Sequence, residues 1–286
     1  QTLSAVKLVK GGTVLGKVWV GEDQTARITL VNASGSAVSA TAVNASTAGT
    51  KTFTTRGVPT GTYTLIATRD AGGYARITVK VNAGAVTKIG GIKLSKKLVQ
   101  ITGTVTGGAV HGSVALTTKP TALGREVRVG TATIWKGQFS GYVVPGSWWV
   151  TAEGDNGKEF RETPTPTRIT ISTARSFNLT TQVTALRVKG TVTFRGKPVP
   201  GLYLFANYQP WLYPTPRSRQ FVADLTDDSG AYKGWWGVEL AETPKPLVAD
   251  LPALDRYTPE YLVTTPLVVS SPTTRLDVEL SLRGLN

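Results

Sequence analysis

Alternating hydrophobic and polar residues recur along the whole chain, and three stretches begin in the same way. These stretches are Val14–Trp19, Ile101–Thr106 and Val188–Thr193, and each has a glycine as its third residue. The glycines Gly16, Gly103 and Gly190 are equally spaced, 87 residues apart. Alternation with a period of two is typical of a strand with one buried face, so each stretch is expected to open a repeated unit of β-strands.

A second landmark follows each opening stretch at a similar distance. A turn glycine precedes an aromatic residue that leads another alternating strand, at Gly49 and Phe53, Gly137 and Phe139, and Gly230 and Tyr232. The first two units also contain a Pro- and Gly-marked hairpin, at Val58–Ala67 and Val144–Ala152. Helical periodicity of useful length is absent. About seven short strands in roughly 90 residues is typical of a small antiparallel β-sandwich.

We therefore expect an all-β protein of three tandem antiparallel β-sandwich domains, over residues 1–97, 98–182 and 183–286. The joints at Ser95–Lys97 and Thr180–Gln182 contain no Gly/Ser-rich or Pro-rich linker. Short joints of this kind predict a stiff, extended rod.

The third unit resembles a known family of sandwich domains. Val188–Gly201 contains Gly-Lys-Pro-Val-Pro-Gly, and Leu225–Tyr232 contains Thr-Asp-Asp-Ser-Gly-Ala-Tyr. These motifs resemble the carboxypeptidase regulatory-like, or transthyretin-like, family and the related B-type stalk domains of collagen adhesins. The first unit carries the family's hairpin motif most clearly. The resemblance implies transthyretin-like or Ig-like sandwiches used as accessory, adhesive and surface-stalk modules.

Composition and charge narrow the setting in which the chain works. There is no Cys and no Met, and Gln1 suits an N-terminus left by signal-peptide cleavage, so we expect a secreted or cell-surface protein. No run of 18 apolar residues predicts a transmembrane helix. The net charge is +14, and residues 1–97 alone carry +10. This imbalance favours an anionic partner.

Catalytic chemistry is poorly represented in the sequence. His111 is the sole histidine and is expected to be a solvated turn residue, so neither a multi-His metal site nor a histidine base is predicted. Asp224, Asp227 and Asp228 form either a calcium loop or a turn capped by its own side chains, and we favour the turn. We expect no enzyme activity, no cofactor and no bound metal.

Three sequence features are candidate contact surfaces. The first is the aromatic loop at residues 206–220, which either binds a ligand or covers a sheet face; its candidate residues are Tyr208, Trp211, Tyr213, Arg217 and Arg219. The second is a set of lysines that either contacts a polyanion or is simply solvated: Lys80, Lys88, Lys93, Lys96 and Lys97. The third is an N-terminal strand that pairs within its own unit or, less favoured, with another copy, through Leu3, Val6 and Leu8.

The leading hypothesis is a secreted or cell-surface binding or adhesion protein whose partner is a surface polymer, a carbohydrate or another protein. The alternative is a subunit of an extracellular filament, pilus or virion that self-assembles by strand addition. An accessory region of a secreted enzyme ranks third. Nucleic acid is disfavoured as the partner because the first unit has few aromatic residues on which bases could stack.

Overall fold

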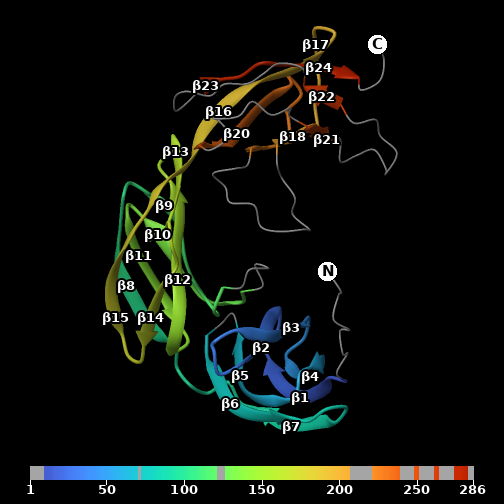
Figure 1. Cartoon of the computed structure of the whole chain (residues 1–286), viewed down its shortest axis with the longest axis vertical. Helices are drawn as coiled ribbons and strands as arrows, with labels where there is room; N and C mark the ends of the chain where they lie inside the picture. The colour runs from blue at the N-terminus through green and yellow to red at the C-terminus, as the bar shows by residue number, and fades with distance from the viewer. Residues whose placement is uncertain are drawn as a thin grey trace, which may run out of the picture.

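The computed structural model describes residues 10–69, 72–120, 126–206, 221–238, 248–250, 261–263 and 274–282. These residues form strands and the turns between them, which confirms the all-β prediction. In Figure 1 the strands follow one another along an arc rather than a straight rod. We call β1–β7 the first group, β8–β15 the second group and β16–β24 the third group. The domain boundaries at residues 97 and 182 stay predictions.

The first group contains β1 (Gly12–Val20), β2 (Gln24–Val31), β3 (Ala37–Ala45), β4 (Gly49–Val58), β5 (Gly61–Arg69), β6 (Tyr74–Val81) and β7 (Val86–Ile92). The second group contains β8 (Val99–Thr106), β9 (His111–Thr117), β10 (Arg128–Trp135), β11 (Gln138–Val143), β12 (Gly146–Asp155), β13 (Glu159–Glu162), β14 (Thr167–Ile171) and β15 (Arg175–Thr180). The third group contains β16 (Gln182–Phe194), β17 (Lys197–Pro198), β18 (Tyr203–Ala206), β19 (Phe221–Ala223), β20 (Ala231–Gly237), β21 (Val248–Asp250), β22 (Tyr261–Val263), β23 (Thr274–Arg275) and β24 (Val278–Leu282).

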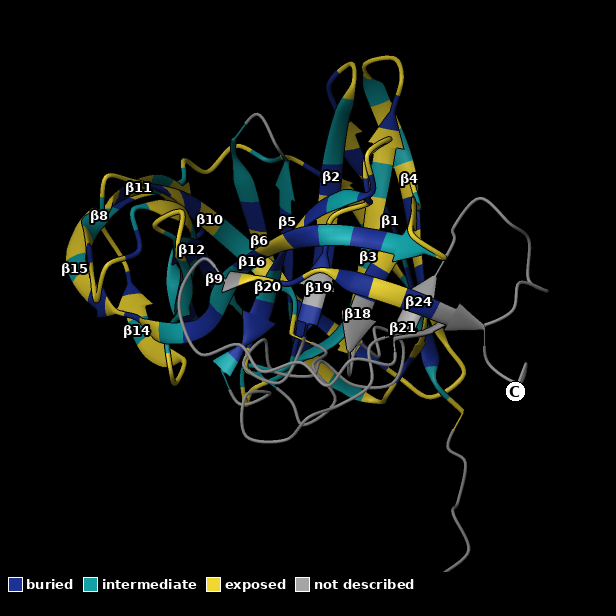
Figure 2. Cartoon of the chain, turned by 90° about the horizontal axis from the view of Figure 1, so that it is seen from above, coloured by how far each residue is buried: buried dark blue, intermediate teal, exposed yellow. Residues whose placement is uncertain are grey.

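Each group has its own cluster of buried hydrophobic side chains. In the first group a four-stranded sheet, β3-β2-β5-β6, and a three-stranded sheet, β4-β1-β7, enclose a core that includes Val14, Ile28 and Leu65. Buried and exposed residues alternate along the strands, as Figure 2 shows by colour. Val31 and Ile66 are exceptions, because they lie in the first group but pack in the core of the second.

The same strand pairing recurs in all three groups. The opening strands β1, β8 and β16 pair antiparallel with β4, β11 and β20, which carry the aromatic landmark. They also pair parallel with the closing strands β7, β15 and β24. The sequence did not predict this parallel pairing, because a period of two records which face of a strand is buried and not the direction of its neighbour.

Each opening glycine lies directly opposite an aromatic residue. The register pairs Gly16 with Phe53, Gly103 with Phe139, and Gly190 with Tyr232. A Cβ on Gly16 would lie 2.6 Å from the Phe53 ring, and one on Gly190 would lie 1.8 Å from the carbonyl oxygen of Leu276. The equal spacing of these glycines therefore reflects a steric requirement, since the opposite ring and the closing strand fill the space that a side chain would occupy.

Each of the two Pro- and Gly-marked hairpins contains the same kind of hydrogen bond, from an aromatic side chain to a backbone carbonyl four residues earlier. Tyr63 Oη donates to the carbonyl oxygen of Pro59 at 2.8 Å, and Trp148 Nε1 donates to that of Val144 at 2.7 Å. Both rings are buried, at 7% and 2% exposure. Each aromatic residue thus folds back over its hairpin and satisfies its polar atom while its ring enters the core.

A side-chain hydrogen bond fastens the closing strand in two groups. Asn178 Oδ1 accepts from Thr104 Oγ1 at 2.7 Å. In the third group, Asp277 Oδ1 accepts from the backbone nitrogen of Thr191 at 2.9 Å and from its Oγ1 at 2.8 Å. Thr104 and Thr191 each follow the opening glycine, so the repeat extends to polar contacts.

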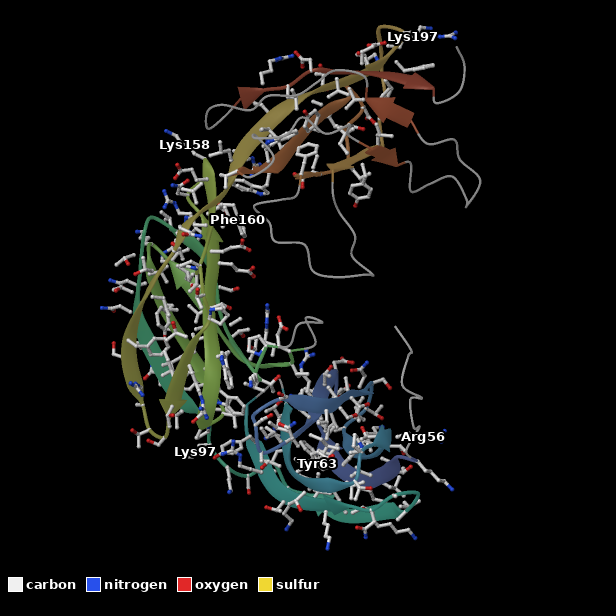
Figure 3. All side chains as sticks on the ribbon, in the orientation of Figure 1. Arg56, Tyr63, Lys97, Lys158, Phe160 and Lys197 are labelled. Carbon is white, nitrogen blue, oxygen red and sulfur yellow. The ribbon has the colours of Figure 1, made fainter. Side chains whose placement is uncertain are left out.

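The joint between the second and third groups is a continuous strand. The first half of β16 pairs with β13 of the second group, and its second half pairs with β20 of the third. The Phe160 and Trp235 ring centroids lie 5.6 Å apart, and the Arg187 guanidinium stacks 4.9 Å from the Trp235 ring. Figure 3 shows Phe160 where the two groups meet. A shared strand resists bending, because bending would break its backbone hydrogen bonds.

The joint between the first and second groups is a side-by-side contact. Lys119 N donates to Gly35 O at 2.8 Å, and Tyr74 forms a β-bridge with Lys96. The Arg76 guanidinium lies 5.8 Å from the Trp148 ring. Val31 and Ile66 are buried at this contact, so the second group partly covers the side of the four-stranded sheet that faces away from the first group's own core.

Replacing Gly103 with Ala is expected to destabilise the protein. The new Cβ would lie 1.7 Å from the carbonyl oxygen of Phe177 and 2.6 Å from the Phe139 ring. Overpacking of this kind costs about 1–3 kcal/mol or more in the free energy of unfolding, which urea titration measures. Gly90→Ala is the matched control, because no atom lies within 4 Å of the place that its methyl group would take. Equal stability of the two variants would contradict the steric account.

Lowering the pH is expected to weaken the third group through Asp277. The hydrogen bond from Arg275 and those from Thr191 lower the pKa of the Asp277 carboxyl from 3.8 to about 2. The unfolded chain holds the proton more tightly, so this carboxylate stabilises the fold above pH 4, and that contribution is lost as the pH falls towards 2. Thermal unfolding of the wild type and of Asp277→Asn between pH 7 and pH 2 tests this. The variant should lose less stability on acidification, and parallel curves would refute the assignment.

Candidate polyanion-binding site

Two of the three surfaces predicted from the sequence lie outside the described residues. These are the aromatic-loop residues Tyr208, Trp211, Tyr213, Arg217 and Arg219, and the N-terminal residues Leu3, Val6 and Leu8. Their roles stay predictions.

The five predicted lysines are all exposed, but the structure does not bring them to one site. Lys80 lies on β6 and Lys88 on β7, where their side chains face solvent. Lys93 follows β7 and is also exposed. Lys96 and Lys97 alone among the five line a cleft, at the junction where Figure 3 labels Lys97.

Two adjoining hollows form this cleft between the first and second groups. The larger, of about 740 Å³, is lined by Arg69, Gly72, Gly73, Leu94, Ser95, Lys96, Lys97, Leu98 and Tyr142. The smaller, of about 420 Å³, is lined by Arg27, Thr68, Arg69, Leu98, Arg128, Val129, Gly130, Thr131 and Tyr142. Because Arg69, Leu98 and Tyr142 line both, we treat the two hollows as one site and call it the basic cleft.

The basic cleft carries charge of a single sign among its described lining residues. Five of them are cationic, namely Arg27, Arg69, Lys96, Lys97 and Arg128, and none is a carboxylate. Cations gathered at a concave surface raise the local concentration of anions, and the effect falls with salt. The geometry therefore suits an anionic ligand.

Neighbouring groups restrain two of these cations. Arg69 Nε donates to the carbonyl oxygen of Gly72 at 2.7 Å, and its guanidinium lies 5.4 Å from the Trp19 ring. Lys96 exchanges two backbone hydrogen bonds with Tyr74, and its ammonium lies 6.0 Å from the Tyr74 ring. Restraint of this kind reduces the side-chain entropy that is lost when an anion binds.

Tyr142 is the aromatic member of the site, and its side chain is 62% exposed. It lies on β11, whose backbone pairs with β10 at Thr131 and with β8 at Gln100. The strand is thus held on both sides, and the ring projects from a rigid position at the wall of the basic cleft.

The acidic side chains of the described residues were the remaining candidates for a metal site. Among them, no group of three or more His, Cys, Asp or Glu side chains could hold a metal ion. Asp227 Oδ1 accepts hydrogen bonds from the backbone nitrogens of Ser229 and Ala231 and from Ser229 Oγ. These bonds, the one from Ser229 Oγ foremost, lower the pKa of Asp227 and support the turn interpretation.

His111 lies exposed at the start of β9, so it is solvent-facing as expected, although it begins a strand rather than sitting in a turn. Its ring centroid lies 4.7 Å from that of Trp135 on the neighbouring strand. Its aromatic partner is therefore Trp135, which sequence reasoning did not single out.

Sequence reasoning missed Arg27, Arg69, Arg128 and Tyr142 as members of the site. The arginines are separated along the chain, and nothing in their spacing brings them together. Tyr142 did leave a signal. It stands three residues after the buried Phe139, hence on the outward face of its strand, where its ring is available to contact a ligand.

No helix among the described residues is both long enough and apolar enough to cross a bilayer.

Comparison with solved structures gives distant likenesses, of which two are described here. No protein-family model matches the chain, and no curated protein matches it. The chain is similar to a solved structure described as the Bacillus anthracis TIE protein, with 12% identity and a TM-score of 0.23, covering 95% of this chain and 51% of that one. This chain therefore spans about half the length of that protein.

It is also similar to GBS52, described as a minor pilin of Streptococcus agalactiae, with 9% identity and a TM-score of 0.23, covering 60% of this chain and 96% of that one. At such low TM-scores, no functional conclusion follows from either likeness.

Proposed function

We propose that this chain is a non-catalytic binding module, secreted or displayed at a cell surface, that holds an anionic polymer in its basic cleft. The observation that carries the proposal is the gathering of five cationic side chains around one concave junction, without a carboxylate among the described lining residues. The extracellular location is the expectation drawn from the sequence.

Charge supports a polymer rather than a single small anion. The first third of the chain carries +10 of the net +14, so the field extends well beyond the cleft. A polymer with many negative groups can meet several cations at once, each contributing about 1 kcal/mol near a charged surface. A single small anion would meet few of these cations and would be weakly held at physiological salt.

The scaffold supports binding rather than turnover. The described lining residues of the cleft include no carboxylate and no histidine. The strand shared by the second and third groups is hydrogen-bonded to both, which restricts bending at that joint. A stiff series of sheets with a binding surface near one end is suited to adhesion.

The proposal is tested by measuring the binding of polygalacturonate and of inorganic polyphosphate to the full chain at several NaCl concentrations. Replacing Lys97 and Arg128 together with Gln is expected to raise the dissociation constant roughly 10- to 30-fold, since two charged contacts are lost. Wild-type affinity should fall steeply as NaCl rises.

The matched control is Lys80→Gln together with Lys88→Gln, which lowers the net charge equally but lies on β6 and β7, outside the residues that line the cleft. Its affinity should stay within about twofold of wild type, a difference of roughly 0.4 kcal/mol. Equal losses in the two pairs would show diffuse attraction without a site. Absence of binding to both polymers at low salt would refute the function.

A further inference from the structure

Tyr142 belongs to a second feature, an exposed sheet face made by β8, β11 and β10. These strands pair in register, so their outward residues form three rows across the sheet. One row is Gln100, Tyr142 and Thr131; the next is Thr102, Ser140 and Thr133; the last is Thr104, Gln138 and Trp135. We call these nine residues the outer face. Seven of them are Thr, Ser or Gln, and none of the nine is charged or aliphatic.

The two remaining residues are large aromatic side chains at opposite ends of the outer face. Tyr142 and Trp135 are each 62% exposed. Their inward neighbours, including Ile134, Phe139 and Val143, are buried, so the core is complete without either ring. The two rings are exposed and the core does not need them, so they are available to contact a ligand.

Both rings are pre-positioned. Trp135 contacts His111, whose ring lies at 58° to it on the adjacent strand β9. Tyr142 rises from a strand that is hydrogen-bonded on both sides. Trp135 lies opposite Gln138, four residues before Tyr142, which places the two rings about 13 Å apart along the strands at ~3.3 Å per residue. That span fits an extended oligomer rather than one small ring.

The chemistry of the outer face matches a carbohydrate. A sugar ring presents an apolar face of C–H groups, which packs on an aromatic ring, and a rim of hydroxyls, which exchange hydrogen bonds with Thr, Ser and Gln side chains. A protein partner would require an apolar centre, and the middle row of this face has only Thr102, Ser140 and Thr133.

Charge then specifies the kind of carbohydrate. Tyr142 is both an end of the outer face and a wall of the basic cleft. Arg128 is the first residue of β10, three residues before Thr131 of the outer face, and it lines the cleft. A chain lying across the outer face would therefore run past Tyr142 towards cationic side chains.

We propose that the outer face and the basic cleft together form one binding site for an extended acidic polysaccharide. Its sugar rings stack on Trp135 and Tyr142, its hydroxyls bond to the polar rows between them, and its acid groups enter the cleft. This inference rests on the proposed function and adds to it the chemical class of the polymer.

The decisive variant is Trp135→Ala, because Trp135 is on the outer face and does not line the cleft. Trp135→Ala removes one of the two proposed stacking contacts, so the dissociation constant for polygalacturonate should rise roughly 5-fold or more. Affinity for polyphosphate, which has the charge but no sugar rings, should be unchanged. Trp135→Phe should keep most of the polygalacturonate affinity, and dextran sulfate in place of polygalacturonate distinguishes sulfate from carboxylate as the acid group.

Tyr203→Ala is the matched control, since Tyr203 is an exposed aromatic residue, at 40%, on β18 of the third group. Unfolding curves of both Ala variants establish that each is folded. Wild-type affinity of Trp135→Ala for polygalacturonate and dextran sulfate would overturn the polysaccharide inference, and so would an equal loss in Tyr203→Ala. If the Lys97→Gln, Arg128→Gln double variant still weakened binding while Trp135→Ala did not, the anionic-polymer function would hold without the polysaccharide inference. If neither variant weakened binding, both proposals would fail.

Discussion

The pairing of a glycine on each opening strand with an aromatic ring on the strand beside it is the constraint on which the three groups depend. Phe139 occupies the space above Gly103, and Tyr232 covers Gly190 in the same way. The closing strand then approaches so closely that the carbonyl oxygens of Phe177 and Leu276 leave no room for a Cβ. One residue choice thus sets the register of an antiparallel pair and admits a parallel strand on the other side.

The two joints between the groups are built differently. At the second joint β16 continues from one sheet into the next, so backbone hydrogen bonds cross the boundary. At the first joint, Val31 and Ile66 extend the core of the second group, and side-chain packing is joined by a backbone hydrogen bond from Lys119 to Gly35 rather than by a shared strand. A side-by-side contact between two curved sheets leaves hollows at its margin, and the basic cleft is one of these. The candidate site therefore exists because the first joint is a packed surface and not a shared strand.

The two exposed aromatic rings of the outer face are not required by the fold. Trp135 and Tyr142 could be replaced by threonine, the commonest residue around them, without opening the core, because the buried side of the sheet is already filled by Ile134, Phe139 and Val143. A lysine-rich surface keeps a protein soluble wherever the charges lie, whereas cations restrained against Trp19 and Tyr74 at one cleft hold a particular geometry. These two observations support the proposal that the outer face and the basic cleft form a contact surface.

The sequence by itself determined the all-β class, the repeat, and the turn and hairpin positions, because glycine spacing, alternation and Pro–Gly turns act over a few residues or at a fixed period. It also indicated the basic first third; of the five lysines that it singled out, Lys96 and Lys97 line the cleft, whereas Lys80, Lys88 and Lys93 do not. Only the tertiary structure decided the parallel closing strands, the arc and the cleft. Arg27, Arg69, Arg128 and Tyr142 come from strands of two groups, and their meeting depends on which sheet face the second group covers. A local pattern shows that a face is exposed, but it does not show what lies across from it once the chain has folded.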